Sequence, residues 1–316
     1  MKKKDQGLYV IGVDGGATKT KAALADLNEK IIKTGKAGSS NPRNVGIKKA
    51  VDNIAKSVKQ VLNPKNKIAS TFIGLAAVEE EYKLRKKEIK KEILKHKEIS
   101  PIFKGKIIIG SDQLVAFRSG TIEKEGISLI AGTGAVVRGW RKNKDFKSSG
   151  WGWLNDEGSG FWTGRRGLSR IFKELDKREK ASLITKITFR EWRLKNNNDL
   201  LKKVYSENFI KTVASISLFL DWAAKKGDQA AELILKEAGK KLSQTATSVI
   251  KELNFQNEKF PLVLVGKTFN SEIILREVKK EIKKIAPRVN FIEPKNEPVL
   301  GAVRLATEEI YQNGEN

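Results

Sequence analysis

Two aspartates each end a short apolar run, at the place where a strand would stop. Asp14 follows the run 8–13, and Asp112 follows the run 106–111. A carboxylate at such a position can hold a hydrated Mg²⁺ ion beside an anion, or accept the proton of an incoming hydroxyl. The two acids therefore suggest chemistry on a phosphate and an alcohol, although a strand that ends in Asp is often only structural.

Glycine-rich loops supply groups that could bind the anion. Gly15 and Gly16 predict a two-residue hairpin turn, because glycine adopts positive φ without steric cost. The N–H groups of this turn, with Thr18 and Lys19, can converge on an anion. A second turn at 132–134 follows another apolar run. Two such turns facing each other would clamp the ends of a polyphosphate; the alternative is an ordinary hairpin with a surface acid.

The elements that carry these residues occur in two similar cycles. A strand–turn–strand opening is followed by alternating helices and strands, once from Leu8 and again from Ile127. This order predicts an internally duplicated α/β protein with a cleft between its halves. We expect strands at 8–13, 19–25, from 31, at 69–76, 106–112, 127–131, 135–140, 260–266 and 289–292, and helices at 45–62, 82–97, 113–119, from 161, two within 210–253, at 270–285 and at 297–310.

The composition excludes several kinds of site. The 316 residues include no cysteine and one histidine, which removes disulfides, thiolate metal sites and cysteine-ligated clusters. No apolar run approaches the roughly 18 residues of a membrane span, and the run after the N-terminal lysines is too short for a signal peptide. We therefore expect a cytoplasmic protein with no membrane partner.

The net charge of +25 makes polyanions plausible partners. The basic residues are nevertheless spread along the whole chain, and their densest block, 82–97, has the pattern of an amphipathic helix with a solvated Lys/Glu face. Nucleic acid is therefore not the expected partner, and a secondary contact through the basic surface is the weakest hypothesis.

The sequence lacks other nucleotide-binding motifs and a nucleophilic triad, because a required residue is missing or misplaced in each. Gly266-Lys267-Thr268 has the tail of a Walker A loop, but Pro261 stands where its first glycine must be. The dinucleotide fingerprint fails because Val137 follows Gly132 and Gly134 at the third glycine position. A nucleophilic triad is disfavoured because the single histidine, His96, lies in the basic helix.

Three segments, in order, resemble the N-acetylglucosamine kinase and BadF-type ATPase family of the actin-like ATPase and sugar kinase superfamily. They are 13–19, 131–134 and 150–160, and the likeness extends to 298–304. It implies two ribonuclease-H-like domains around an interdomain cleft, closing over ATP and substrate, with the last helix returning to the first domain. We expect these domains to comprise residues 1–118 plus 303–316, and residues 119–302.

The resemblance also implies a role for each motif residue. Asp14 would meet Mg²⁺ and Asp112 would be the catalytic base that deprotonates a sugar 6-hydroxyl. The residues implied to contact ATP are Gly15, Gly16, Thr18, Lys19, Gly132, Thr133, Gly134 and Gly266. The residues implied to contact the sugar are Asn41, Asp112, Thr133, Gly150, Trp151 and Asp156. Polar groups on loops suit sugar hydroxyls, and the indole of Trp151 offers a flat apolar face for a ring.

The sequence departs from the family pattern at three places. Lys267 follows Gly266 where a second glycine is usual, Asn155 replaces a glycine, and Gln113 replaces a small residue beside the base. Family members that activate a partner reductase use a cysteine-bound cluster, and a chain without cysteine cannot be one of them.

The expected function is ATP-dependent phosphorylation of an amino sugar at O6, with N-acetylglucosamine as the leading substrate. Glucosamine and N-acetylmuramic acid kinases are alternatives. An ATP-binding switch or ATPase without sugar turnover is a further alternative from a different class. Family members are often dimers, so a homodimer is one option for this chain.

Overall fold

The structure is a computed structural model that describes residues 7–63, 66–76, 78, 83–100 and 106–312. The chain forms two compact units, one of residues 1–123 with 294–316 and the other of residues 124–293. From the sequence we expected this division after residues 118 and 302.

The first unit contains a five-stranded sheet in the order β3-β2-β1-β4-β5. β1, β2 and β3 form an antiparallel meander, whereas β4 and β5 run parallel to β1. The parallel strands all end at one edge of the sheet. The strand bounds are β1 Leu8–Gly15, β2 Thr20–Asp26, β3 Ile31–Ala37, β4 Lys67–Leu75 and β5 Lys106–Ser111.

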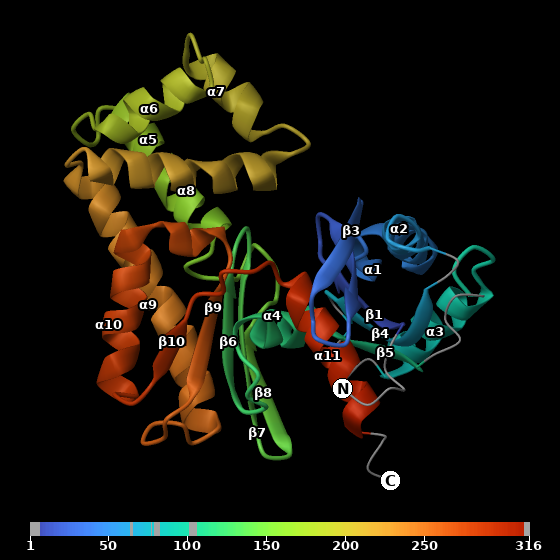
Figure 1. Cartoon of the computed structure of the whole chain (residues 1–316). Helices are drawn as coiled ribbons and strands as arrows, with labels where there is room; N and C mark the ends of the chain where they lie inside the picture. The colour runs from blue at the N-terminus through green and yellow to red at the C-terminus, as the bar shows by residue number, and fades with distance from the viewer. Residues whose placement is uncertain (1–6, 64–65, 77, 79–82, 101–105, 313–316) are drawn as a thin grey trace. The chain divides into compact units, whose positions relative to one another are not determined.

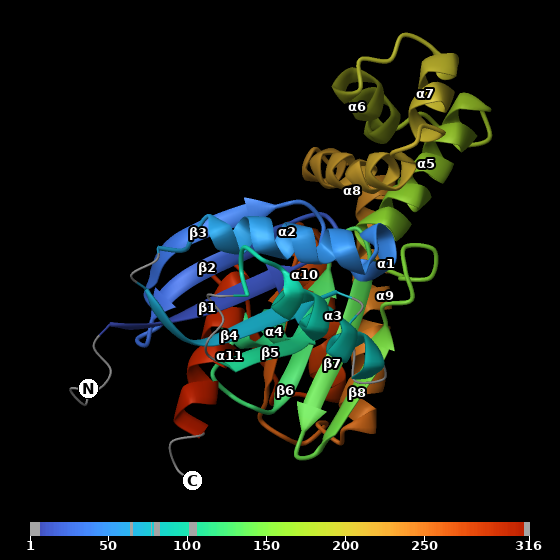
Figure 2. The ribbon, with the colours of Figure 1, turned by 90° about the vertical axis from the view of Figure 1, so that its right-hand side faces the viewer.

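Helices cover both faces of this sheet. Ile11 and Val13 of β1 pack with α2 and α3, whereas Val10 packs with α4 and α11 on the opposite face, as the alternation of side chains in a strand requires. α2 contacts β2 and β3 (Figure 2), and α11 returns from the end of the chain to lie on β1 and β4. The helices are α1 Pro42–Val45, α2 Ile47–Lys59, α3 Lys83–Lys95, α4 Asp112–Gly120 and α11 Val299–Gln312.

The second unit repeats this sheet topology. Its order is β10-β9-β6-β7-β8, in which β6, β7 and β8 form the meander and β9 and β10 run parallel to β6. The duplication and the α/β fold class predicted from the sequence are therefore confirmed. The strands are β6 Gly126–Ala131, β7 Ala135–Arg141, β8 Lys144–Ser149, β9 Pro261–Val265 and β10 Asn290–Ile292.

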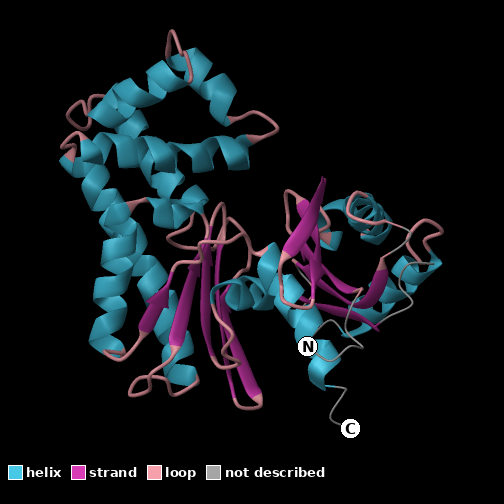
Figure 3. Cartoon of the chain, viewed as in Figure 1, coloured by secondary structure: helices cyan, strands magenta, loops and turns pink. Residues whose placement is uncertain are grey.

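In the second unit, some helices pack on the sheet and others pack only on neighbouring helices. α9 contacts β6, β7 and β8, while α6 packs on α5 and α8, and α7 packs on α8 (Figures 1 and 3). The helices are α5 Gly160–Leu175, α6 Leu183–Glu191, α7 Asn197–Val204, α8 Phe209–Lys225, α9 Gln229–Glu252 and α10 Glu272–Ile285, with a short 3₁₀ turn, η3, at Lys267–Asn270.

Several local features differ from the prediction. The predicted helix 45–62 corresponds to α2, and Gly46, with φ of 77°, separates it from the short helix α1, which was not predicted. The second meander has a third strand, β8, where only a turn and a loop were expected. α6 and α7 were not predicted. The predicted basic helix 82–97 is α3, whose Ile89 and Ile93 are buried and whose Leu94 is exposed. Residue 82 lies outside the described residues.

No helix in the described part of the chain is both long and apolar enough to cross a bilayer.

Candidate active site

The carboxyl ends of three parallel strands form one row in the first unit. Gly15 of β1 pairs with Leu75 of β4, which pairs in turn with Ser111 of β5. Neighbouring strands lie about 4.8 Å apart, so Gly15 and Ser111 are about 10 Å from one another. Asp14 precedes the first of these residues and Asp112 follows the last. The two acids selected from the sequence therefore stand at the same edge of one sheet.

Asp14 lies near the carboxyl end of β1, on the face that carries α4 and α11. Its direct partner on β2 is Lys21, which pairs in turn with Lys36 on β3. Burial raises the pKa of Asp14 to about 6, against the opposing charges of Lys19 and Lys21. A buried carboxylate of this kind is stabilised by a nearby cation.

The carboxylate of Asp14 fits the role of a Mg²⁺ ligand. The hard carboxylate oxygens of Asp14 are a ligand type that Mg²⁺ prefers, and a dication would offset the cost of burying the charged form. Among the described residues, no group of three or more His, Cys, Asp or Glu side chains forms a metal cage. One carboxylate together with waters and substrate phosphates is the usual Mg²⁺ environment in such a case.

The loop after Asp14 is longer than predicted. Gly15 pairs with Thr20 as the last rung of the β1–β2 ladder, so the loop spans residues 16–19 and closes with a hydrogen bond from Gly16 N to Lys19 O of 3.0 Å. Neither glycine takes a positive φ, so the predicted two-residue hairpin turn is wrong. Gly15 is required by packing instead, because a Cβ there would lie 2.4 Å from Leu75 Cδ2. Thr18 and Lys19 are exposed on the loop.

Asp112 opens α4. Ser111 caps this helix by accepting a hydrogen bond from Leu114 N at 3.2 Å, which places Asp112 in the first turn. A carboxylate at this position is stabilised by the helix dipole. The residue is half-buried, and its Oδ1 atom is shielded from solvent. Gln113, the departure noted beside it, is buried.

Asn41 lies on a loop that is tied to the loop 16–19. Its side chain accepts a hydrogen bond from Arg43 N at 2.9 Å and caps α1. Ser40 N donates to Gly16 O at 3.3 Å, and Asn53 of α2 donates to Ser39 O at 2.6 Å. The bond from Ser40 to Gly16 therefore joins the two loops, and the bond from Asn53 joins the Asn41 loop to α2.

In the second unit, the loop 132–134 lies between β6 and β7, against the start of α5. Gly160 N donates to Gly132 O at 2.7 Å, and Phe161 N donates to Thr133 O at 3.1 Å. Gly266, at the end of β9, adopts φ of 117°, and a Cβ on it would lie 2.1 Å from Ala131 O. The structure therefore brings the predicted residues Gly132, Thr133, Gly134 and Gly266 together.

Asp156 is enclosed by hydrogen-bond donors. Its Oδ1 accepts from Ser149 Oγ at 3.1 Å and from three successive backbone N–H groups, those of residues 150–152, at 3.0 to 3.3 Å. Its Oδ2 accepts from Ala135 N at 3.1 Å. Burial raises the pKa of Asp156, and these hydrogen bonds draw it back down. The carboxylate, which is 4% exposed, fixes the backbone of the loop 150–152.

The two tryptophans of this loop differ in environment. Trp151 is 74% exposed, with Lys147 Nζ 5.0 Å from its ring centroid. Trp153 packs edge-to-face on Phe161 and Phe209, at 4.7 and 5.3 Å between centroids. Trp151 therefore presents an aromatic face to solvent, whereas Trp153 anchors the loop.

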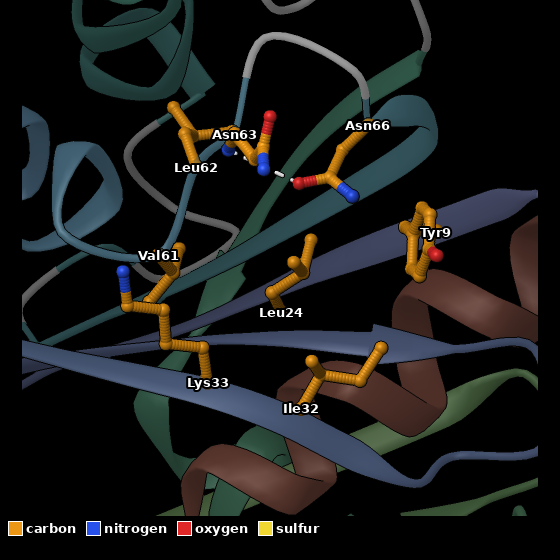
Figure 4. Close-up of a pocket in the computed structure, with 8 residues that line it drawn as sticks. All are labelled: Tyr9, Leu24, Ile32, Lys33, Val61, Leu62, Asn63 and Asn66. Atoms are coloured by element: carbon orange, nitrogen blue, oxygen red, sulfur yellow. Dashed lines mark hydrogen bonds between the residues drawn. The ribbon is translucent and has the colours of Figure 1, made fainter.

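The first unit also contains a pocket of about 450 Å³ (Figure 4). It is lined by Tyr9 at the start of β1, together with Leu24, Ile32 and Val61, and Asn63 N donates to Asn66 Oδ1 at its rim. Tyr9 precedes Asp14 by five positions along β1, which corresponds to roughly 17 Å. This pocket is therefore separate from Asp14 at the other end of the strand.

Comparison with known proteins identifies the family. The profile of the BadF/BadG/BcrA/BcrD ATPase family matches residues 11–306. The chain belongs to this family. The resemblance stated from the sequence motifs is thus confirmed, and the match includes every residue that the motifs selected.

Two relatives match almost the whole chain. An N-acetylmuramic acid/N-acetylglucosamine kinase of Clostridium acetobutylicum is 30% identical over 312 residues, which are 95% of this chain and 99% of the relative. An N-acetyl-D-glucosamine kinase of Dictyostelium discoideum is 30% identical over 319 residues, which are 94% of this chain and 97% of the relative.

Solved structures support the fold of this family member. A protein from Chromobacterium violaceum, provisionally assigned as an N-acetylglucosamine kinase, superposes with a TM-score of 0.70 at 20% identity, over 94% of this chain and 98% of its own. A ROK family glucokinase from Streptomyces griseus, in complex with glucose and AMPPNP, gives 0.62 at 14% identity, over 95% and 99%. At these identities the likeness concerns the fold alone: two α/β units of the actin-like ATPase and sugar kinase type.

Sequence reasoning missed three residues that organise the site. Lys21 and Glu297 form a close ion pair in the first unit, and Ser149 completes the donor set around Asp156. The alternation 19–21 was a signal for Lys21, since it places that side chain on the face of Asp14. Nothing in the sequence indicates Glu297 as its partner.

Proposed function

We propose that this member of the family is an ATP-dependent kinase that phosphorylates an amino sugar at O6. The observation that carries the proposal is the position of Asp112, in the first turn of α4 and at the same sheet edge as Asp14. The two relatives named as kinases of N-acetylated amino sugars supply the substrate class.

In the proposed reaction, the chain positions two substrates and accepts one proton. The backbone at Gly15 and Gly16 and the side chains of Thr18 and Lys19 contact phosphate oxygens of ATP, as do the residues of the loop 132–134, and Gly266 lies beside the nucleoside. Asp14 would hold a Mg²⁺ ion, which would neutralise phosphate charge. The protein contributes mainly by positioning the substrates and stabilising charge, because phosphoryl transfer depends chiefly on these two effects.

Asp112 is the proposed general base. Its carboxylate accepts the proton of the sugar 6-hydroxyl as that oxygen attacks the γ-phosphorus; the bond from the γ-phosphorus to the β,γ-bridging oxygen breaks, and ADP leaves. At the start of α4 the helix dipole favours the negative charge of this carboxylate.

The proposed sugar contacts come from Asn41, Thr133, Gly150, Trp151 and Asp156. The exposed indole of Trp151 can stack on the sugar ring. Asp156 already accepts five hydrogen bonds, so we propose that it acts on the sugar mainly by fixing the backbone of its loop and thereby the position of Trp151. N-acetylglucosamine is the proposed substrate, with N-acetylmuramic acid and glucosamine as the alternatives to compare.

The test is ADP release by the wild-type protein and by Asp112→Asn, with Mg²⁺-ATP and a panel of N-acetylglucosamine, N-acetylmuramic acid, glucosamine, glucose and no sugar. We expect release that depends on an amino sugar, and a loss of at least about 100-fold in kcat for Asp112→Asn, because the base contributes roughly that factor. Binding of ADP should be unchanged.

Glu232→Gln is the matched control, because Glu232 is an acid in the first turn of α9 that pairs with Lys236. It should turn over like wild type. Wild-type turnover by Asp112→Asn would refute the assignment of the base, and ADP release independent of sugar would favour an ATPase or switch.

A further inference from the structure

Lys21 is a buried cation at the candidate phosphate site that the proposed reaction does not use. The residue is 9% exposed, and its ammonium forms a close ion pair with Glu297. Glu297 lies two residues before the start of α11. Burial, together with the charges of Lys36 and Lys19, lowers the pKa of Lys21. A cation this buried requires a carboxylate partner, because water cannot solvate it adequately.

A second carboxylate is within reach of this ammonium. Lys21 pairs with Asp14 directly across β1 and β2, and directly opposed residues have Cβ atoms about 5 Å apart on the same face. The lysine side chain is long enough to span that separation. In this structure the ammonium is nevertheless paired with Glu297, whose side chain is 53% exposed. On its other side Lys21 faces Lys36, which offers it no partner.

The pairing of Lys21 bears on what Asp14 can bind. If the ammonium turned to Asp14, it would occupy the carboxylate oxygens that a divalent cation needs, and the two cations would compete for them. We propose that Glu297 holds Lys21 away from Asp14 and so keeps the Asp14 carboxylate available to a nucleotide-bound divalent cation. Glu297 is thus a positioning residue, acting through Lys21.

The inference rests on the proposed nucleotide role of Asp14 but not on the identity of the sugar. The experiment therefore uses ADP and Mn²⁺ without sugar. Calorimetry gives the factor by which saturating Mn²⁺ tightens ADP binding, and this factor isolates the metal from the general attraction of lysines for phosphate. The variants are Glu297→Gln, Lys21→Met and the double variant, each with its melting temperature measured.

We expect Glu297→Gln to reduce the tightening factor about five- to thirtyfold, because a partly buried ammonium then competes for Asp14. The double variant should return the factor to within about twofold of wild type, because the competitor is gone. Lys21→Met alone should also keep the wild-type factor, and it tests the idea even if Glu297→Gln does not fold.

Glu29→Gln is the matched control. Glu29 forms an ion pair with Arg304 on α11, at 2.9 Å, and the change removes a comparable link within the same unit. Its tightening factor should equal that of wild type. The inference is overturned if Glu297→Gln behaves like Glu29→Gln, if the double variant stays as impaired as Glu297→Gln, or if Lys21→Met alone lowers the factor. A wild-type protein that binds no ADP would overturn the proposed function as well.

Discussion

The carboxylate of Asp156 offers a quantitative test of the site, through the variant Asp156→Asn. The amide must place its NH₂ group where one carboxylate oxygen was. If it replaces Oδ2, the amide N–H of Ala135 loses its acceptor; if it replaces Oδ1, the four donors from residues 149–152 lose theirs. Even the better orientation leaves one buried donor unsatisfied and turns four charge-assisted hydrogen bonds into neutral ones.

The magnitude follows from these contacts. An unsatisfied buried donor costs about 1–3 kcal/mol, and the weakening of the remaining hydrogen bonds adds about 2 kcal/mol. We therefore expect a loss of about 3–5 kcal/mol. For a unit the size of residues 124–293 each kcal/mol lowers Tm by about 2–4 °C, so Tm should fall by about 10 °C.

Differential scanning calorimetry measures this loss, with Glu157→Gln as the control. Glu157 is the next residue, and its side chain is 51% exposed and pairs with Lys241 at 3.2 Å. The control removes the same charge but no enclosed hydrogen bonds, so it should change stability by less than about 1 kcal/mol. Equal shifts of Tm for Asp156→Asn and Glu157→Gln would refute the structural role given to Asp156.

Two further predictions concern Asp14 and Gly266. Burial raises the pKa of Asp14 to about 6, above its value in the unfolded chain, so the stability that this group gives the metal-free protein is present at low pH and lost as pH rises through about 6. The affinity for Mn²⁺ should rise over the same pH range. The variant Asp14→Asn should abolish the first trend in urea titrations and the second in calorimetry. Gly266→Ala and Gly152→Ala share a positive φ, of 117° and 116°, but only the first places a Cβ against a backbone oxygen, at 2.1 Å, while the second meets nothing within 4 Å. Urea unfolding should therefore show Gly266→Ala to be less stable by at least about 2 kcal/mol than Gly152→Ala, and equal midpoints would contradict the packing described for Gly266.

The fold could be predicted largely because its strands are apolar and its turns contain glycine. The duplicated order of elements was predicted from this alternation of apolar runs and glycine-containing turns alone. β8 was missed because an edge strand reading Lys-Asp-Phe-Lys-Ser-Ser has the polarity of a loop. α6 and α7 were missed because they pack on other helices rather than on the sheet, so that no strand pattern frames them.

The sequence predicted which residues belong to the candidate site, but not the contacts that hold them in place. Asp14 and Asp112 were found because strand ends concentrate function in open α/β sheets. Gly15 was selected for a turn conformation, whereas the structure requires it for close packing on Leu75. The donors around Asp156 and the pairing of Lys21 with Glu297 join segments far apart in sequence, and no local pattern encodes such contacts.

The return of α11 to the first unit has a consequence for how the chain is made. Val303 and Ala306 of this helix cover Val10 and Ala23 on the sheet of the first unit. During synthesis the part of that face which α11 covers stays exposed until residues 299–312 have left the ribosome, whereas residues 124–293 are continuous and can fold as soon as they emerge. The N-terminal sheet is therefore the last part to be completed, and a nascent chain stalled before Val299 would present an uncovered apolar surface to chaperones.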